Sequence, residues 1–94
     1  MTQSIDFNKS TLIAVTNSLN DLIKKGRITT NFKEVNRITK LDFYLSVRSR
    51  RNFLWRNLKV LHDIGLIEKE KRIIFLPREK ISFNEILKQE QANI

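Results

Sequence analysis

Glycine and proline, the residues that most often interrupt helices and strands, are scarce in this chain of 94 residues. The chain contains only Gly26, Gly65 and Pro77, so long stretches can form regular structure without a break. The sequence shows no internal repeat, low-complexity segment or linker. At this length we expect one small domain over residues 1–94, with its core in residues 9–77.

Two helices and a short strand are predicted in the first part of the chain. Apolar residues recur at steps of three and four in residues 9–25, which indicates an amphipathic helix. Its apolar stripe consists of Leu12, Val15, Leu19, Leu22 and Ile23. The β-branched run at residues 27–30 predicts a short strand. Asn31 and Glu34 have the spacing of a capping box, so a second helix should begin after Asn31.

A third helix is predicted in the centre of the chain. Ser49 is its expected N-cap, and it runs to about residue 64, where Gly65 ends it. Its outward face holds Arg51, Asn52, Trp55, Arg56, Lys59 and His62. Asn57 projects into the apolar side, so we expect it either to bond a backbone carbonyl or to lie at the edge of that side. Residues 40–48 fit a long turn, an extra helical turn or a separate short helix.

A hairpin and a last helix are predicted in the C-terminal part. Two short β-rich runs within residues 66–76 indicate the hairpin, with its tip near residues 69–71. Pro77 ends the second strand. A further capping-box spacing predicts a C-terminal helix over about residues 82–92. The expected fold class is therefore α+β, mostly α.

Positive charge is concentrated in one part of the chain. The protein has 18 Lys and Arg against 10 Asp and Glu, for a net charge of +8. Residues 46–62 contain no acid and five bases, which are Arg48, Arg50, Arg51, Arg56 and Lys59. A helix face that is merely solvated usually mixes both signs. The pattern therefore favours a polyanion partner, most often nucleic acid.

The sequence argues against several other functional classes. The absence of cysteine excludes disulfides, cysteine-ligated zinc and thiol chemistry. A single histidine, His62, argues against a histidine metal site or a Ser-His-Asp triad. The longest apolar runs are far shorter than the ~20 residues of a membrane span, and the N-terminus lacks a signal-peptide pattern. We expect no catalytic residues, cofactor, metal, membrane partner or small-molecule ligand, and a cytoplasmic location (nucleoid-associated, or in the host cytoplasm if viral).

The order helix, strand, helix, helix, hairpin, helix resembles that of the winged helix-turn-helix DNA-binding superfamily. The run Leu61-His-Asp-Ile-Gly65-Leu66-Ile67 is similar to the junction at which the recognition helix of such proteins meets the wing. The resemblance covers residues 9–77 and includes small MarR- and ArsR-like regulators and compact winged-helix proteins of archaeal viruses and plasmids. It implies a three-helix core, a short strand, a two-stranded wing and a C-terminal helix. Two departures are a longer connection before the third helix and a short wing without a tip glycine.

The resemblance also implies a binding mode. Helix 49–64 would enter the major groove of double-stranded DNA, and hairpin 66–76 would act as the wing. Base reading would fall to Arg50, Arg51, Asn52 and Trp55. Phosphate contacts would fall to Arg48, Arg56, Lys59, Lys69, Lys71 and Arg72. Arg50 lies near the inward side of the helix and qualifies only because it is in the first turn. Trp55 could instead pack under the hairpin or under residues 40–48. Glu68 and Glu70 should weaken the contribution of the hairpin lysines.

These observations favour a sequence-specific DNA-binding protein, which we expect to be a transcriptional regulator. One alternative is a DNA-binding module for plasmid or viral replication or partition. Others are a winged-helix protein-interaction module and a non-specific architectural or RNA-binding protein. Because so small a domain often gains stability by association, we also expect a homodimer formed through residues 9–25 and 82–92.

Overall fold

Gly26 and Gly65 both adopt positive φ angles, of 83° and 81°, and each lies just beyond the end of a long helix. The first of these helices is α1 (Phe7–Lys24) and the second is α3 (Val47–Asp63). A left-handed residue at this place lets the chain turn away from the helix axis. The two glycines thus end the helices as the sequence predicts.

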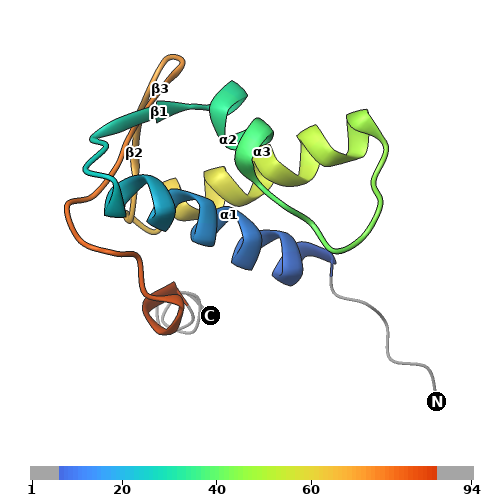
Figure 1. Cartoon of the computed structure of the whole chain (residues 1–94), viewed down its shortest axis with the longest axis horizontal. Coiled ribbons are helices and arrows are strands. Elements are labelled where there is room, and N and C mark those ends of the chain that lie inside the picture. The colour runs from blue at the N-terminus through green and yellow to red at the C-terminus, as the bar shows by residue number, and fades with distance from the viewer. Residues whose placement is uncertain (1–6, 87–94) are drawn as a thin grey trace.

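The computed structural model describes residues 7–86 and confirms a small α+β, mostly helical fold. The remaining elements are β1 (Thr29–Asn31), α2 (Phe32–Ile38), β2 (Glu68–Glu70) and β3 (Ile73–Phe75). A helical segment also covers residues 83–86, and the rest of the predicted C-terminal helix lies outside the described residues. In Figure 1 the strands gather at one end of α1, beside α2.

The start of α2 is fixed by a hydrogen bond that the sequence predicts. Asn31 Oδ1 accepts from the backbone N–H of Glu34 at 2.8 Å. The Glu34 carboxylate does not complete a capping box, because it accepts hydrogen bonds from the Arg27 guanidinium at 2.7 and 3.0 Å and from the Thr30 hydroxyl. These bonds hold the pKa of Glu34 below its ordinary value of 4.5. The bonds between Arg27 and Glu34 therefore link the segment before β1 to α2.

The start of α3 differs from the prediction. Ser46, not Ser49, is the N-cap, and its hydroxyl accepts from the backbone N–H of Ser49 at 3.2 Å. The reason is that Ser46 keeps an extended backbone, with φ −60° and ψ 159°, whereas Ser49 is already helical. Residues 39–46 form neither helix nor strand, so a long irregular connection joins α2 to α3.

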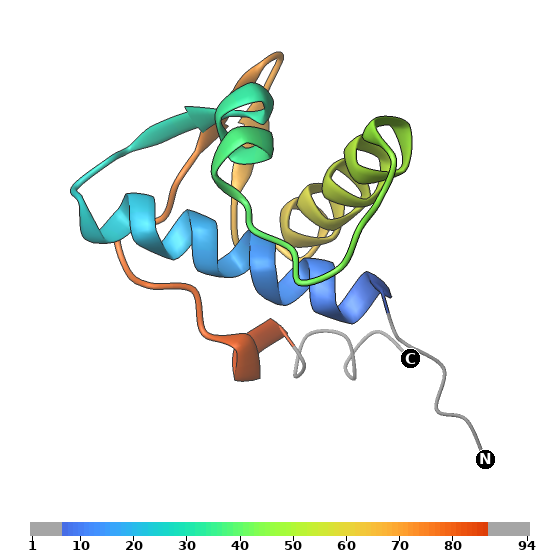
Figure 2. The same cartoon turned by 45° about the vertical axis from the view of Figure 1, so that its right-hand side comes forward.

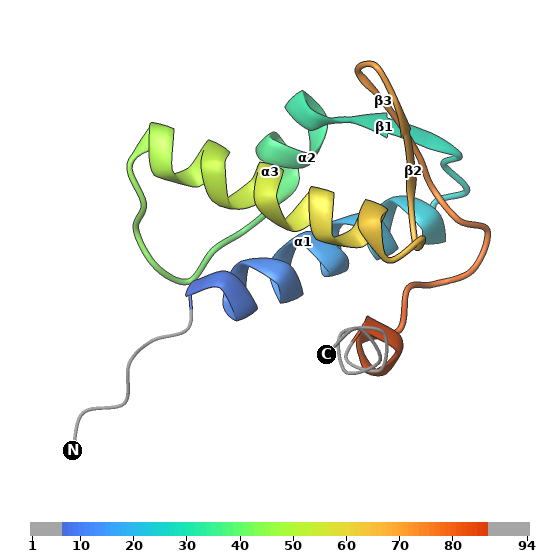
Figure 3. The same cartoon turned by 180° about the vertical axis from the view of Figure 1, so that it is seen from behind.

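The core lies where α1, α2 and α3 pack together beside the inner face of the sheet, and Figure 3 shows how these elements are arranged. All four of the predicted α1 stripe positions from Leu12 to Leu22 are buried, and Ile23 packs against them. On α3 the buried residues are Leu54, Asn57, Leu58 and Leu61. The Asn57 amide donates to the backbone carbonyl of Phe53 at 2.7 Å, as predicted, which satisfies this polar group inside the core.

The sheet is antiparallel, with strand order β1-β3-β2. The hairpin strands are shorter than the predicted range of residues 66–76, and the chain reverses at Lys71, which has φ 55°. Leu66 and Ile67 precede β2 rather than belonging to it, and Ile67 is buried in the core. The hairpin is therefore anchored to the core at its base and is short beyond it.

The segment after β3 crosses to the side of α1 opposite α2 (Figure 2). Asn20 on α1 holds it there through two hydrogen bonds with the backbone of Ile81. The Asn20 amide donates to the Ile81 carbonyl at 3.0 Å, and the Ile81 N–H donates to Asn20 Oδ1 at 2.7 Å. No helix within residues 7–86 is long and apolar enough to cross a membrane.

Candidate nucleic-acid interface

The outward face of α3 is polar and basic, as the helical pattern predicts. All six residues assigned to this face are exposed: Arg51, Asn52, Trp55, Arg56, Lys59 and His62. From Phe53 onward, the apolar residues on the other side are buried or half-buried in the core. The face is therefore presented to solvent by the burial of its opposite side.

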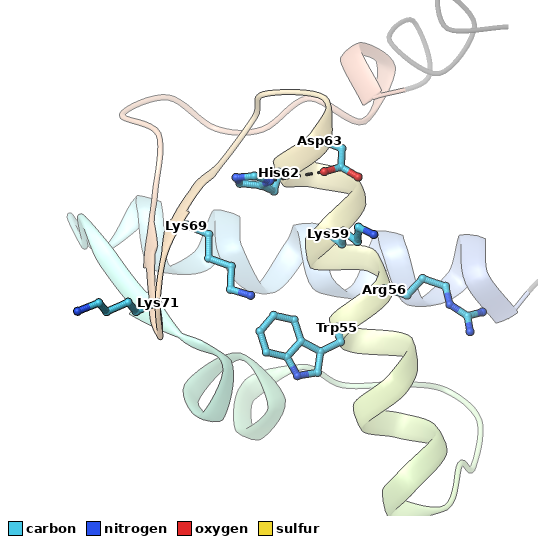
Figure 4. Close-up of a pocket in the computed structure, with 7 residues that line it drawn as sticks. All are labelled: Trp55, Arg56, Lys59, His62, Asp63, Lys69 and Lys71. Carbon is cyan, nitrogen blue, oxygen red and sulfur yellow. Dashed lines mark ion pairs between the residues drawn. The ribbon is translucent and has the colours of Figure 1, made fainter.

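Two adjoining hollows lie between α3 and the hairpin, with volumes of about 750 and 540 Å³. Figure 4 shows the larger one, which is lined by Trp55, Arg56, Lys59, His62, Asp63, Lys69 and Lys71. The smaller is lined by Asn31, Phe32, Lys33, Arg51, Trp55, Lys69, Lys71, Arg72 and Ile74. Because Trp55, Lys69 and Lys71 border both, we describe the pair as one feature, the α3–hairpin groove.

The α3–hairpin groove is strongly positive. Its basic residues are Lys33, Arg51, Arg56, Lys59, Lys69, Lys71 and Arg72. One carboxylate, Asp63, lies among the lining residues, and its Oδ1 is 3.5 Å from Nδ1 of His62. Clustered cations in a concave surface create a positive potential that attracts polyanions.

The hairpin separates its charges by the alternation of its side chains. Lys69 is paired with Ile74, which is 1% exposed, so both lie on the inner face toward α3. Glu68 and Glu70 are paired with Phe75 and Ile73 and share their outer, exposed face. The two acids therefore lie on the sheet face opposite the one that carries Lys69.

Trp55 packs between the elements that form the groove. Its indole stacks on the Phe32 ring, with 4.9 Å between centroids and 10° between planes. The Lys69 ammonium lies over the same indole, 3.5 Å from the ring centroid. In the structure Trp55 thus packs between α2 and the hairpin. The indole is still 38% exposed, at the boundary between the two hollows.

Arg50 does not lie with the other candidate base-reading residues. Its Nε donates to Asn36 Oδ1 at 2.9 Å, and its Nη2 donates to the backbone carbonyls of Asn36, at 2.6 Å, and Thr39. The guanidinium is thus occupied at the C-terminal end of α2. In the structure, the Nε and Nη2 donors of Arg50 therefore face the protein, which sets Arg50 apart from the exposed Arg51 and Asn52.

Some of the remaining predicted residues line the two hollows, and others lie outside both. Arg51 and Arg72 line the smaller hollow, and Arg56 and Lys59 line the larger. Arg48 and Asn52 are exposed on α3 but line neither hollow. Lys33, which sequence reasoning did not assign to the site, lies in the smaller hollow. The sequence shows the charge of Lys33, but it does not show which side of α2 packs against α3.

No protein-family model, curated protein or solved structure matches this chain. Within residues 7–86, no three His, Cys, Asp or Glu side chains are grouped so as to hold a metal ion. The groove offers cations, the Asn31 amide and the aromatic rings of Trp55 and Phe32. These groups are suited to binding phosphates and base edges.

Proposed function

We propose that this protein is a winged helix-turn-helix protein that binds double-stranded DNA sequence-specifically and regulates transcription. The proposal is supported by the order of its elements, α1-β1-α2-α3-β2-β3, which is the order that the sequence resemblance implies. It is also supported by a helix whose exposed face is basic and lies beside a hairpin.

In the proposed complex, α3 lies in the major groove, which is wide enough for a helix. Arg51 and Asn52, in the N-terminal half of α3, are the base-reading residues. Arginine can bridge O6 and N7 of guanine, and asparagine can bridge N6 and N7 of adenine. Both side chains are exposed and thus accessible to a base.

Phosphate contacts come from the cations that border the α3–hairpin groove. Arg56 and Lys59 extend from α3, and Lys69, Lys71 and Arg72 extend from the hairpin. Such contacts supply most of the affinity and make it fall with rising salt. With three-residue strands, the hairpin follows the DNA backbone in this proposal and does not insert deeply into the minor groove.

The observation that carries the proposal is the separation of charge across the hairpin. Lys69 faces α3, whereas Glu68 and Glu70 occupy the opposite face of the sheet. Like charges from two elements repel each other when they lie in one groove, and a bound polyanion would offset that repulsion. A phosphate backbone lying along the groove would meet cations from both α3 and the hairpin.

We retain the homodimer as part of the proposal. A hollow of about 470 Å³ beside α1 is bordered by Ile13, which is 39% exposed, and by Phe83. A second copy would cover this surface and place two α3 helices about one DNA turn apart, ~34 Å, on a pseudo-palindrome. Sedimentation should give the mass of a dimer at high micromolar concentration, and the mass of a monomer there would contradict this part.

Selection from a random-sequence duplex pool tests the function. The wild-type protein should enrich an inverted repeat at ~50 and at ~200 mM salt, and Arg51→Ala should lose the preference at one position in each half-site. Arg78→Ala is the matched control, because Arg78 is exposed and lies outside the groove lining. Binding that enriches no sequence and disappears at the higher salt would leave only a general polyanion surface.

A further inference from the structure

Arg50 differs from its neighbours on α3 in what it touches. Arg48 and Arg51 are exposed, whereas Arg50 is half-buried and turns back toward α2. Its guanidinium donates three hydrogen bonds, two of which go to main-chain carbonyls. The partners, Asn36 and Thr39, are 14 and 11 residues away in the sequence. Arg50 therefore connects the first turns of α3 to the end of α2.

The end of α2 is a suitable place for a guanidinium. Thr39 is the C-cap of α2, and the last carbonyls of a helix have no partner within the helix. These carbonyls carry partial negative charge, which a cation stabilises. The planar arginine fork satisfies the carbonyls of Asn36 and Thr39 together with the Asn36 side chain. A lysine, with one ammonium group, cannot reproduce that geometry.

The long connection between α2 and α3 makes this contact important for their relative position. Residues 39–46 contain no helix or strand, so a tight turn does not set the angle between the two helices. Arg50 crosses directly from α3 to α2 and bypasses this segment. Phe32 on α2 and Trp55 on α3 stack at the other end of the same helix pair.

We propose that Arg50 is a positioning residue for DNA recognition: it caps the C-terminal end of α2 and thereby sets how α3 presents Arg51. This inference rests on the proposed DNA binding, but it assigns Arg50 no contact with DNA. The adjacent arginines thus have different tasks. Arg51 reaches outward to a base, and Arg50 holds the helix that carries it.

The binding test uses Arg50→Lys, which keeps the charge and loses the fork. Its affinity for the selected duplex should fall by about tenfold, because without the fork α3 is expected to hold the binding orientation in only about a tenth of the molecules. Arg78→Lys is the matched control, because Arg78 is exposed and lies outside the groove lining, and its affinity should change less than about twofold.

The salt dependence separates positioning from direct contact. Because Arg50 touches no phosphate in this account, Arg50→Gln should bind more weakly with an unchanged slope of log affinity against log salt. If Arg50 instead contacts a phosphate, the slope should fall by about 0.9, and the proposal is overturned. Full affinity in Arg50→Lys would overturn it as well.

A second measurement does not depend on DNA. The double variant Arg50→Lys/Asn36→Ala should shift the unfolding midpoint by less than the sum of the shifts of the two single variants. The reason is that both substitutions remove the same hydrogen bond. Arg50→Lys should also change the emission of Trp55, whose stacking on Phe32 depends on the same helix angle. Additive shifts and unchanged emission would show that Arg50 positions nothing. A coupled pair in a protein that binds no duplex would instead contradict the proposed function alone.

Discussion

The ammonium group of Lys69 lies 3.5 Å from the centroid of the Trp55 indole ring, so a cation from β2 rests on an aromatic residue of α3 (Figure 4). This contact joins the two elements that border the groove. A cation over an indole at a partly exposed site contributes about 0.5–1 kcal/mol. The contact therefore helps to fix the hairpin at one distance from α3.

The first prediction concerns this contact. Lys69→Ala should lower the free energy of unfolding by about 0.5–1 kcal/mol and change the emission of Trp55, the one tryptophan in the sequence. Urea denaturation followed by that emission measures both effects. Arg72→Ala removes the same charge from the exposed part of the hairpin and should stay within about 0.5 kcal/mol of wild type. Equal losses in the two variants would show that the Lys69–Trp55 contact contributes nothing specific.

The second prediction concerns the two faces of the hairpin. Lys71 lines the groove, so Lys71→Gln should weaken DNA binding and reduce the salt slope by about 0.9. Glu70 lies on the opposite face, so Glu70→Gln should change the affinity by less than about twofold at 0.15 M salt, where exposed charges are screened. Fluorescence anisotropy with a labelled duplex provides both values. A gain in Glu70→Gln as large as the loss in Lys71→Gln would contradict the separation of charge.

The third prediction concerns the junction between α3 and the hairpin. Gly65 has φ 81°, and a Cβ built there meets no atom within 4 Å. The cost of Gly65→Ala is therefore one of backbone conformation, about 1–2 kcal/mol of unfolding free energy. Gly65→Asn should lose less, because asparagine tolerates the left-handed region better. If both variants unfold at the wild-type urea concentration, the junction does not require a positive φ.

The fourth prediction concerns pH. Hydrogen bonds from Arg27 and Thr30 lower the pKa of Glu34 below 4.5 in the folded protein. A carboxyl group whose pKa is lowered by folding adds stability above its unfolded pKa, and that stability is lost as pH falls through the folded pKa. The wild-type unfolding free energy should therefore decrease between about pH 5 and pH 3 more steeply than that of Glu34→Gln. Parallel curves for the two proteins would show that the Arg27–Glu34 pair does not stabilise the fold.

Much of the fold was predictable because it depends on local patterns. The apolar stripe from Leu12 to Leu22 and the outward basic face of α3 follow from helical periodicity alone. Asn57 was recognisable as a misfit, and its bond to Phe53 resolves it locally within one helical turn. The beginning of α3 was not predictable in this way. Ser46 and Ser49 both have a hydroxyl that can cap a helix, and the path of residues 39–46 decides between them.

The candidate site depended more on tertiary structure. Arg50 and Arg51 are identical in chemistry, and only the position of the α2 C-terminus shows that Arg50 is already bonded. Likewise, the sequence places Glu68 beside Lys69, and the strand register is needed to put them on opposite faces. Lys33 borders the groove only because α2 packs against α3 in an orientation that leaves the side of α2 with Lys33 exposed.

The most direct test of the central claim compares two triple variants of equal net charge. Arg56→Gln/Lys59→Gln/Lys71→Gln removes charge from the groove, and Lys24→Gln/Lys25→Gln/Arg78→Gln removes the same charge elsewhere, so each lowers the net charge from +8 to +5. The measurement is duplex affinity as a function of salt concentration. The groove variant should lose about 2.7 from the salt slope, while the matched variant keeps the wild-type slope. Equal slopes for the two variants would show that duplex affinity depends only on the net charge of the protein. That result would contradict a binding site between α3 and the hairpin.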